Sequence, residues 1–144
     1  MRPVYHAIAS TVLSAGVYAV TKSVPAAAVQ WVGGVLIDTD HIAEYFARKK
    51  GRRSFSDFFS IQMNESFEKI VFPFHGWELA VVFGFLAGLF ATPVVGFSLW
   101  LGMTQHLAFD QAVNPARPFS YFIIFRMVHK FKTAVCFPSS TAKK

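Results

Sequence analysis

Four apolar runs dominate this sequence and restrict what it can fold into. They cover residues 3–21, 25–40, 75–91 and 93–110, and we expect each to form a membrane helix. The first run is apolar or small apart from His6, and a helix of its length spans about 28 Å, close to the thickness of a bilayer core. The fold class predicted is therefore all-α, a polytopic membrane bundle of about four transmembrane helices.

The composition supports a membrane location. Hydrophobic residues make up 53% of the chain and charged residues only 15%, and there are 17 phenylalanines. Ordinary soluble domains contain roughly 45–50% hydrophobic residues and about 25% charged residues. With 144 residues the chain has room for a single domain, here an integral-membrane domain over 1–144. Cys136 is the only cysteine, which excludes an internal disulfide and a cysteine-based zinc cluster.

Local signals mark where the helices start, and they leave two alternatives open. Pro25 suits the first turn of the second helix, and Thr92 followed by Pro93 predicts an N-cap and a new helix. The last two runs would then form a hairpin. The alternative is one long proline-kinked helix over 76–108. The opening run could instead be a cleavable signal peptide, because Arg2 precedes it and SVPAAA follows it.

Two further segments mix aromatic and polar residues. Their uninterrupted apolar stretches are too short to span a bilayer. They cover 54–72, after a strongly basic run, and 118–133, which contains Arg126 and His129. This pattern is typical of amphipathic helices that lie at a membrane surface. We expect both segments to be interfacial.

The unusual polar residues fall at matching ends of the four runs. If each run crosses the membrane once, the start of the first, the end of the second, the start of the third and the end of the fourth share one side. Four imidazoles and four carboxylates gather there: His6, Asp38, Asp40, His41, His75, Glu78, His106 and Asp110. The opposite side has no His, Asp or Glu. Because ionisable groups at membrane depth cost roughly 2.5–3.5 kcal/mol each, such a group predicts a functional site.

The basic residues give the orientation. Thirteen of the 14 Lys and Arg lie on the side of the polar group, and Lys22 alone lies on the other. The positive-inside rule makes the crowded side the cytoplasm, so the site and the C-terminus should face it from a plasma or inner membrane. The net charge of +6 then reflects membrane orientation, and membrane lipid rather than nucleic acid is the expected partner.

The spacings within the polar group fit metal ligation. His106 and Asp110 are four residues apart on a helix and His75 and Glu78 three apart, so each pair shares a helix face. Mixed imidazole and carboxylate ligands suit zinc, with manganese or iron as alternatives. Eight ligand groups exceed the needs of one ion, so one or two divalent ions are predicted. Two ions would activate water and clamp a phosphoester.

The motifs resemble those of the YdjM-type inner-membrane metal-dependent hydrolases, which are grouped with zinc-dependent phospholipase C and P1-type nucleases. The shared features are His6, the DTDH of residues 38–41, a His-led motif at His75, and His106-x-x-x-Asp110. The resemblance covers about residues 5–110. It implies hydrolysis, with these metal ligands: His6, Asp40, His41, His75, His106 and Asp110.

The sequence departs from that family at three places. Ile37 stands where the family has proline, Gln105 where it has serine, and FHGWEL offers a single histidine where the family has two. Glu78 could replace the second histidine as a ligand.

The function predicted is hydrolysis of an ester or phosphoester, with lipid as one candidate substrate, by metal-activated water at the cytoplasmic face. Glu78 or Asp38 is the predicted general base when it is not a ligand. Which of Asp38 and Asp40 binds metal stays open, with Asp40 preferred because it adjoins His41. The alternative is a non-catalytic metal-binding or ion-transporting membrane protein.

Overall fold

The computed structural model describes residues 3–48, 51, 54, 69, 71–114 and 116–138, and these residues are almost entirely helical. The elements are α1 (Pro3–Thr21), α2 (Val24–Val35), the 3-10 turn η1 (Leu36–Asp38), α3 (Thr39–Arg48), α5 (Trp77–Phe90), α6 (Pro93–Val113), α7 (Ile123–Val128) and α8 (Thr133–Cys136). Within the described ranges there is no β-strand, only an isolated bridge between Lys69 and Lys132. The all-α fold class is confirmed.

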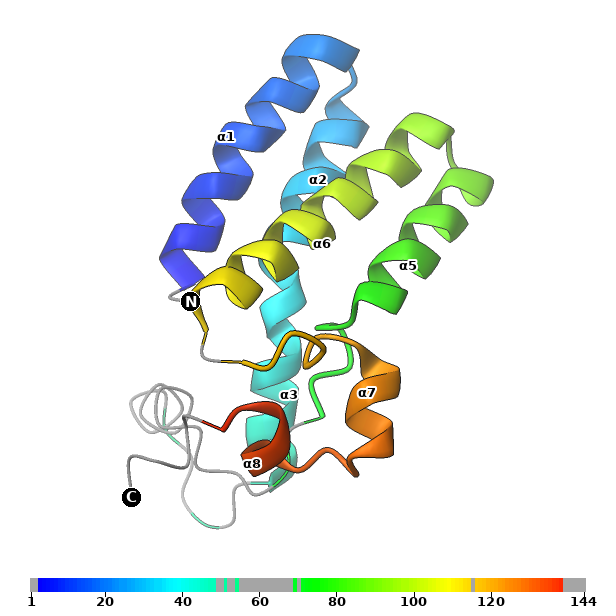
Figure 1. Cartoon of the computed structure of the whole chain (residues 1–144). Coiled ribbons are helices and arrows are strands. Elements are labelled where there is room, and N and C mark those ends of the chain that lie inside the picture. Colours follow the sequence, from blue (N-terminus) through cyan, green and yellow to red (C-terminus); the bar gives the residue numbers. More distant parts are fainter. Residues whose placement is uncertain are drawn as a thin grey trace.

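Four helices, α1, α2, α5 and α6, form a bundle, and α3, α7 and α8 lie beyond one end of it (Figure 1). Helix α6 packs against both α2 and α5, and α1 packs mainly against α2. Glycines allow the close approach of α2 and α6. A Cβ added at Gly102 would collide with the carbonyl oxygen of Gln30, and one at Gly33 would meet Leu99 at 3.0 Å.

Helices α5 and α6 form a hairpin rather than one kinked helix. The chain turns at Ala91 and Thr92, where the Thr92 side chain accepts a hydrogen bond from the Val95 N–H, and Pro93 begins α6. The two helices then run back along each other, since a Cβ added at Gly84 would meet Trp100 and one at Gly96 would meet Gly88. The N-cap and the proline start are those that the sequence predicts.

Helix α2 ends earlier than expected. The sequence predicts a helix to residue 40, whereas α2 stops at Val35 and η1 leads directly into α3. Near this end the carbonyl oxygen of Gly34 accepts a hydrogen bond from Nδ1 of His106 at 2.9 Å. The early end of α2 places Asp38 in the turn between two helices.

One helix in the described part of the chain is long and apolar enough to cross a membrane. It is α1, with 19 residues and a mean hydropathy of 1.3, and it lies near the N-terminus. Helix α5 is apolar but has only 14 residues. The structure thus supports one membrane span, and the polytopic arrangement remains a proposal.

The C-terminal segment differs from the single interfacial helix predicted over 118–133. It contains two short helices, α7 and α8, separated by Lys130 and Phe131, both of which have positive φ angles. Left-handed backbone at two successive residues cannot continue an α-helix. The other interfacial prediction, 54–72, falls mostly outside the described residues.

Candidate metal centre

The polar group predicted from the sequence meets at one end of the bundle. His6 comes from α1, Asp38 from η1, and His75 from the turn before α5. His106 and Asp110 come from successive turns of α6 and share one face of it. Four segments, distant in sequence, therefore deliver side chains to one place.

Four side-chain atoms form the centre of this group, which we call the metal cluster: Asp38 Oδ1, His75 Nε2, His106 Nε2 and Asp110 Oδ2. Asp38 Oδ1 lies 3.3 Å from each imidazole Nε2. Asp110 Oδ2 lies 3.6 Å from each, and the two Nε2 atoms are 3.3 Å apart. His75, His106 and Asp110 are buried, so the cluster is largely enclosed.

These separations are those of a tetrahedral coordination shell. Nitrogen and oxygen ligands at 2.0–2.1 Å from a zinc ion lie about 3.3–3.4 Å from one another when the geometry is tetrahedral. The five distances that involve an imidazole nitrogen span 3.3–3.6 Å, and all four atoms lie within 4.8 Å of one another. The cluster could hold a metal ion without substantial rearrangement.

The hydrogen bonds of the two imidazoles leave their Nε2 atoms as acceptors. Nδ1 of His106 donates to the Gly34 carbonyl, which cannot donate in return. Nδ1 of His75 lies 3.0 Å from Oδ2 of Asp40, to which it donates. In a neutral imidazole the other nitrogen then carries a lone pair. With both imidazoles neutral, two lone pairs and two carboxylate oxygens would face one another in the metal cluster, an arrangement that either a proton or a metal ion stabilises.

Asp40 orients His75 rather than adding to the tetrahedral set. Its Oδ2 accepts both from His75 Nδ1 and from the Phe74 N–H, each at 3.0 Å. A carboxylate behind a ligating imidazole fixes the ring and increases its basicity. The geometry therefore favours Asp38 as the ligand and Asp40 as its outer partner, the reverse of the sequence-based preference. Asp40 also forms a second possible ligand group, with His41 and His75.

His6 lies behind Asp110 in the same way. Its Nε2 is 3.1 Å from Oδ1 of Asp110, and its ring stacks on that of His106 with centroids 3.8 Å apart. Since Asp110 Oδ2 faces the metal cluster, His6 contacts the oxygen that points away from it. His6 belongs to neither possible ligand group, and its observed contact is with Asp110, so its predicted role as a ligand stays a prediction.

The metal cluster opens to its surroundings beside Asp38 and His41. The Asp38 side chain is 24% exposed and that of His41 13%, whereas those of His75 and His106 are at most 2% exposed. Nε2 of His41 lies 3.6 Å from Oδ1 of Asp38. A small molecule would reach the cluster from this side.

Burial and hydrogen bonding oppose each other in setting the charges. Burial alone would lower the pKa of His75, but hydrogen bonds to Asp110, Asp38 and Asp40 raise it well above its ordinary value. Burial would raise the pKa of Asp38, yet hydrogen bonds from His106 and His75 hold it below its usual range. Burial and the neighbouring His75 lower the pKa of His41 to about 3, so His41 is neutral at physiological pH. Carboxylates that retain a charge here attract a cation.

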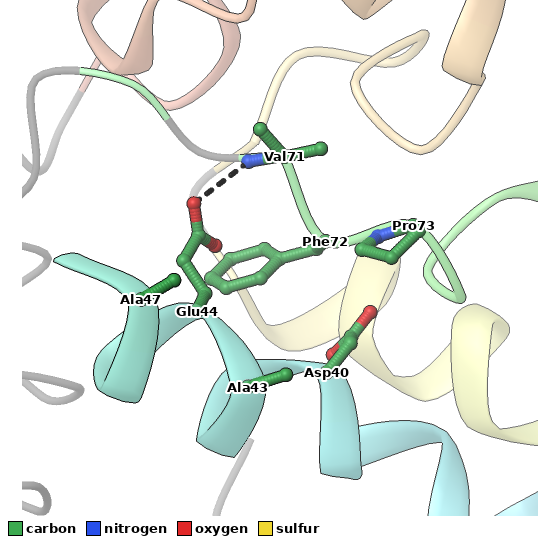
Figure 2. A pocket seen from close by; sticks show the side chains of 7 residues that line it. All are labelled: Asp40, Ala43, Glu44, Ala47, Val71, Phe72 and Pro73. Carbon is green, nitrogen blue, oxygen red and sulfur yellow. Dashed lines mark hydrogen bonds between the residues drawn. The ribbon is translucent and has the colours of Figure 1, made fainter.

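A pocket of about 260 Å³ adjoins this site at Asp40. Figure 2 shows it between α3 and the segment 71–73, with Phe72 above Ala43 and the Glu44 carboxylate accepting from the Val71 N–H. Oδ1 of Asp40 is buried and has no hydrogen-bond partner among the described residues. The pocket offers room for part of a substrate next to the candidate metal centre.

Glu78 is not brought into the metal cluster. Its two carboxylate oxygens accept hydrogen bonds from the backbone N–H groups of Ile123 and Ile124, at 3.0 and 3.2 Å, at the start of α7. Glu78 belongs to neither possible ligand group. Its predicted role as a base remains untested, and its observed role is to cap α7.

Sequence reasoning did not single out Arg126 as a site residue. In the structure it is buried against the segment that carries His75. The residue is 1% exposed, and its guanidinium donates to the backbone carbonyls of Val71, Phe72 and His75. In the sequence it lies among lysines and aromatic residues, a pattern that indicates a membrane surface. No local signal distinguishes it, because its partners are backbone atoms more than fifty residues away.

Comparisons with protein families, with curated proteins and with solved structures find no match to this chain. The resemblance to the YdjM-type hydrolases therefore stays a prediction from the motifs at His6, residues 38–41, His75 and His106. The class that the fold and the site define is a helical protein with a buried histidine and aspartate cluster that could hold a metal ion.

Proposed function

We propose that this protein is a membrane-embedded, metal-dependent hydrolase that acts on an ester or phosphoester at the cytoplasmic face. The observation that supports the proposal is the metal cluster, in which two imidazole nitrogens and two carboxylate oxygens from three segments lie at tetrahedral spacing. An ion bound there would act as a Lewis acid and lower the pKa of a bound water.

Zinc is the ion that this ligand set suits best. Two imidazoles and two carboxylates favour Zn, Mn or Fe over Mg or Ca, which prefer oxygen throughout. The two possible ligand groups share His75, so the site could hold one ion or two. Three carboxylates close to one divalent ion leave a net negative charge unless a further cation is near, and Arg126 lies close enough to Asp40 to interact favourably with it.

The residues of the chain have distinct parts in this proposal. Asp38, His75, His106 and Asp110 hold the ion, and Asp40 and His6 fix the ligands from behind. The side open to substrate is bounded by Asp38 and His41. His41 adjoins Asp38 on this side, with its Nε2 3.6 Å from Oδ1 of Asp38.

A membrane setting is supported by the apolar surface of the bundle. Val20 of α1 is 85% exposed and Phe90 of α5 is 87% exposed, and both belong to apolar faces of long or strongly apolar helices. An apolar surface of this extent is more stable in contact with lipid than in contact with water. In this proposal α1 crosses the bilayer, and α2, α5 and α6 complete the bundle. Where the length of a helix differs from the thickness of the bilayer, the helix would tilt or the bilayer would thin locally.

A metal-binding protein without catalysis, or an ion transporter, is the second candidate. It is favoured by polar groups that continue from the site into the bundle: Oε1 of Gln105 accepts from Ser10 at 3.1 Å and from Gln30 at 3.4 Å. Beyond them a groove lined mainly by apolar residues such as Leu13, Val17 and Phe97 separates α1 from α6. Transport would need polar groups that continue through this region.

The test is metal analysis of the full-length protein purified in detergent, followed by assays with chromogenic phosphate and carboxylate esters. We expect about one zinc per chain, ester hydrolysis that a chelator abolishes, and recovery on adding zinc. Replacing His106 or Asp110 by alanine should remove metal and activity and leave membrane insertion intact. His129→Ala is the matched control, because His129 contacts the Phe125 carbonyl outside the metal cluster.

Two outcomes would contradict the proposal. Purified protein without bound transition metal, and unable to bind added zinc, would leave the polar group as a structural element. Bound zinc without hydrolysis of any ester would favour the second candidate. A reporter fused after Lys144 tests the orientation separately and should report the cytoplasm, as the positive-inside rule predicts.

A further inference from the structure

One buried arginine, Arg126, donates hydrogen bonds to the backbone that carries His75. Arg126 of α7 donates from Nη2 to the carbonyl of His75 at 2.6 Å, and from Nη1 to the carbonyl of Phe72 at 3.0 Å and to that of Val71. A guanidinium presents donors in a rigid planar fork, which a lysine ammonium cannot reproduce. One side chain therefore fixes both ends of the turn that precedes α5.

The same two segments are joined by further hydrogen bonds. The Glu78 carboxylate accepts from the N–H groups of Ile123 and Ile124, and the Tyr121 carbonyl accepts from the Trp77 N–H at 3.0 Å. Gly76 leaves no room between them, because a Cβ added there would meet Ile123 at 2.5 Å. The start of α7 is thus fixed to the start of α5, which places Arg126 one turn further on, beneath His75.

The positive charge of Arg126 is also favourable at this position. The guanidinium is buried, and of the ionised groups around it Asp40 interacts with it most favourably. Asp40 is the carboxylate that accepts from Nδ1 of His75. Arg126 therefore holds the backbone of His75 by direct hydrogen bonds, and its positive charge is favourable near the carboxylate that orients the His75 ring.

We propose that Arg126 is a positioning residue of the metal centre, which acts by fixing the turn 71–75 so that His75 Nε2 meets the other three ligand atoms. The inference rests on the proposed function, since it concerns how the same centre is built. It assigns α7, in a segment that the sequence marks only as a membrane-surface helix, the task of completing the site. Metal affinity should then depend on a residue that touches no metal.

The experiment compares Arg126→Lys and Arg126→Gln with the wild type in the full-length, detergent-solubilised protein. After removal of metal, zinc affinity is measured by competition with a chromophoric chelator, and Co²⁺ binding by its visible absorption, which reports coordination geometry. Thermal unfolding of the metal-free proteins is measured in parallel. Arg117→Lys is the matched control, because Arg117 is an exposed arginine.

We expect both Arg126 variants to weaken zinc binding by about 10–100-fold, the range for partners that orient a ligand from behind. Arg126→Lys should not restore the zinc affinity, because lysine keeps the positive charge but lacks the planar fork of guanidinium donors. The Co²⁺ spectrum of the variants should depart from that of the wild type, and Arg117→Lys should match the wild type in every measurement. Wild-type zinc affinity and Co²⁺ spectrum in Arg126→Lys, even with a lowered melting temperature, would overturn the inference.

A second variant covers the case in which the Arg126 variants fail to fold. Glu78→Gln keeps an acceptor oxygen and loses the negative charge at the start of α7, so it should loosen α7 and weaken zinc binding in the same direction. Wild-type affinity in Glu78→Gln would then overturn the inference. Wild-type protein that binds no zinc at all would overturn the proposed function together with this inference, which distinguishes the two failures.

Discussion

The Nε2 atoms of His75 and His106 face each other at 3.3 Å, although neither can donate a hydrogen bond to the other in the neutral form. Each ring donates its Nδ1 proton elsewhere, His106 to the Gly34 carbonyl and His75 to Asp40. Two ring nitrogens with lone pairs repel each other unless a proton or a metal ion lies between them. This relationship is the basis of the metal site and of the first two predictions.

Asp38→Asn and Asp40→Asn should differ in their effect on metal binding. Asp38 contributes an oxygen to the metal cluster, whereas Asp40 acts through Nδ1 of His75. An asparagine at 40 can still accept from the imidazole, so a loss of about 10–100-fold in zinc affinity is expected there, and a larger loss at 38. Zinc titration of both variants measures the difference. A greater loss for Asp40→Asn would restore the assignment of Asp40 as the ligand.

Zinc affinity should decrease as the pH is lowered from about 8 to about 6, because metal binding must displace protons from the ligands. In the metal-free protein, hydrogen bonds to three carboxylates raise the pKa of His75, so its proton competes with the ion even near neutral pH. The measurement is zinc affinity across this range, with proton release followed in weakly buffered solution. Zinc affinity that does not change with pH would argue that no histidine is a ligand.

Gly102→Ala should destabilise the bundle, and Gly16→Ala should not. A Cβ at residue 102 collides with the Gln30 carbonyl between α6 and α2, and overpacking of this kind costs about 1–3 kcal/mol. A Cβ at residue 16 meets nothing within 4 Å, and the helical preference of alanine should add about 0.5–1 kcal/mol of stability. Thermal unfolding in detergent tests both. Equal melting temperatures would show that α2 and α6 do not pack as closely as described.

Ala43→Phe should lower kcat/KM for ester hydrolysis without changing the amount of bound zinc. Ala43 lines the pocket beside Asp40 and is not a ligand, so a phenyl ring there would fill the space and leave the metal cluster intact (Figure 2). Ala112→Phe, at an exposed position near the end of α6, is the matched control. Unchanged kinetics in Ala43→Phe would show that substrate does not use this pocket.

The sequence by itself determined the class of fold and most of the site. Apolar runs of helical length predicted the helices α1, α2, α5 and α6, and Thr92 with Pro93 predicted the hairpin turn, because capping and proline effects are local. Placing ionisable residues at matching ends of these runs brought His6, Asp38, His75, His106 and Asp110 together. That inference needed only the alternation of helix direction.

The tertiary structure decided the roles within that group. Whether Asp38 or Asp40 faces the metal cluster depends on the end of α2 at Val35, next to which the Gly34 carbonyl accepts a hydrogen bond from His106, 72 residues further along the chain. The hydrogen bonds of Glu78 and Arg126 were also decided by the tertiary structure, since Glu78 caps α7 and Arg126 holds the His75 turn. Their partners are backbone groups of distant segments, and hydrogen bonds to backbone leave no pattern in side-chain identity. The sequence can state which residue types meet, but the direction in which each side chain points is set by long-range contacts.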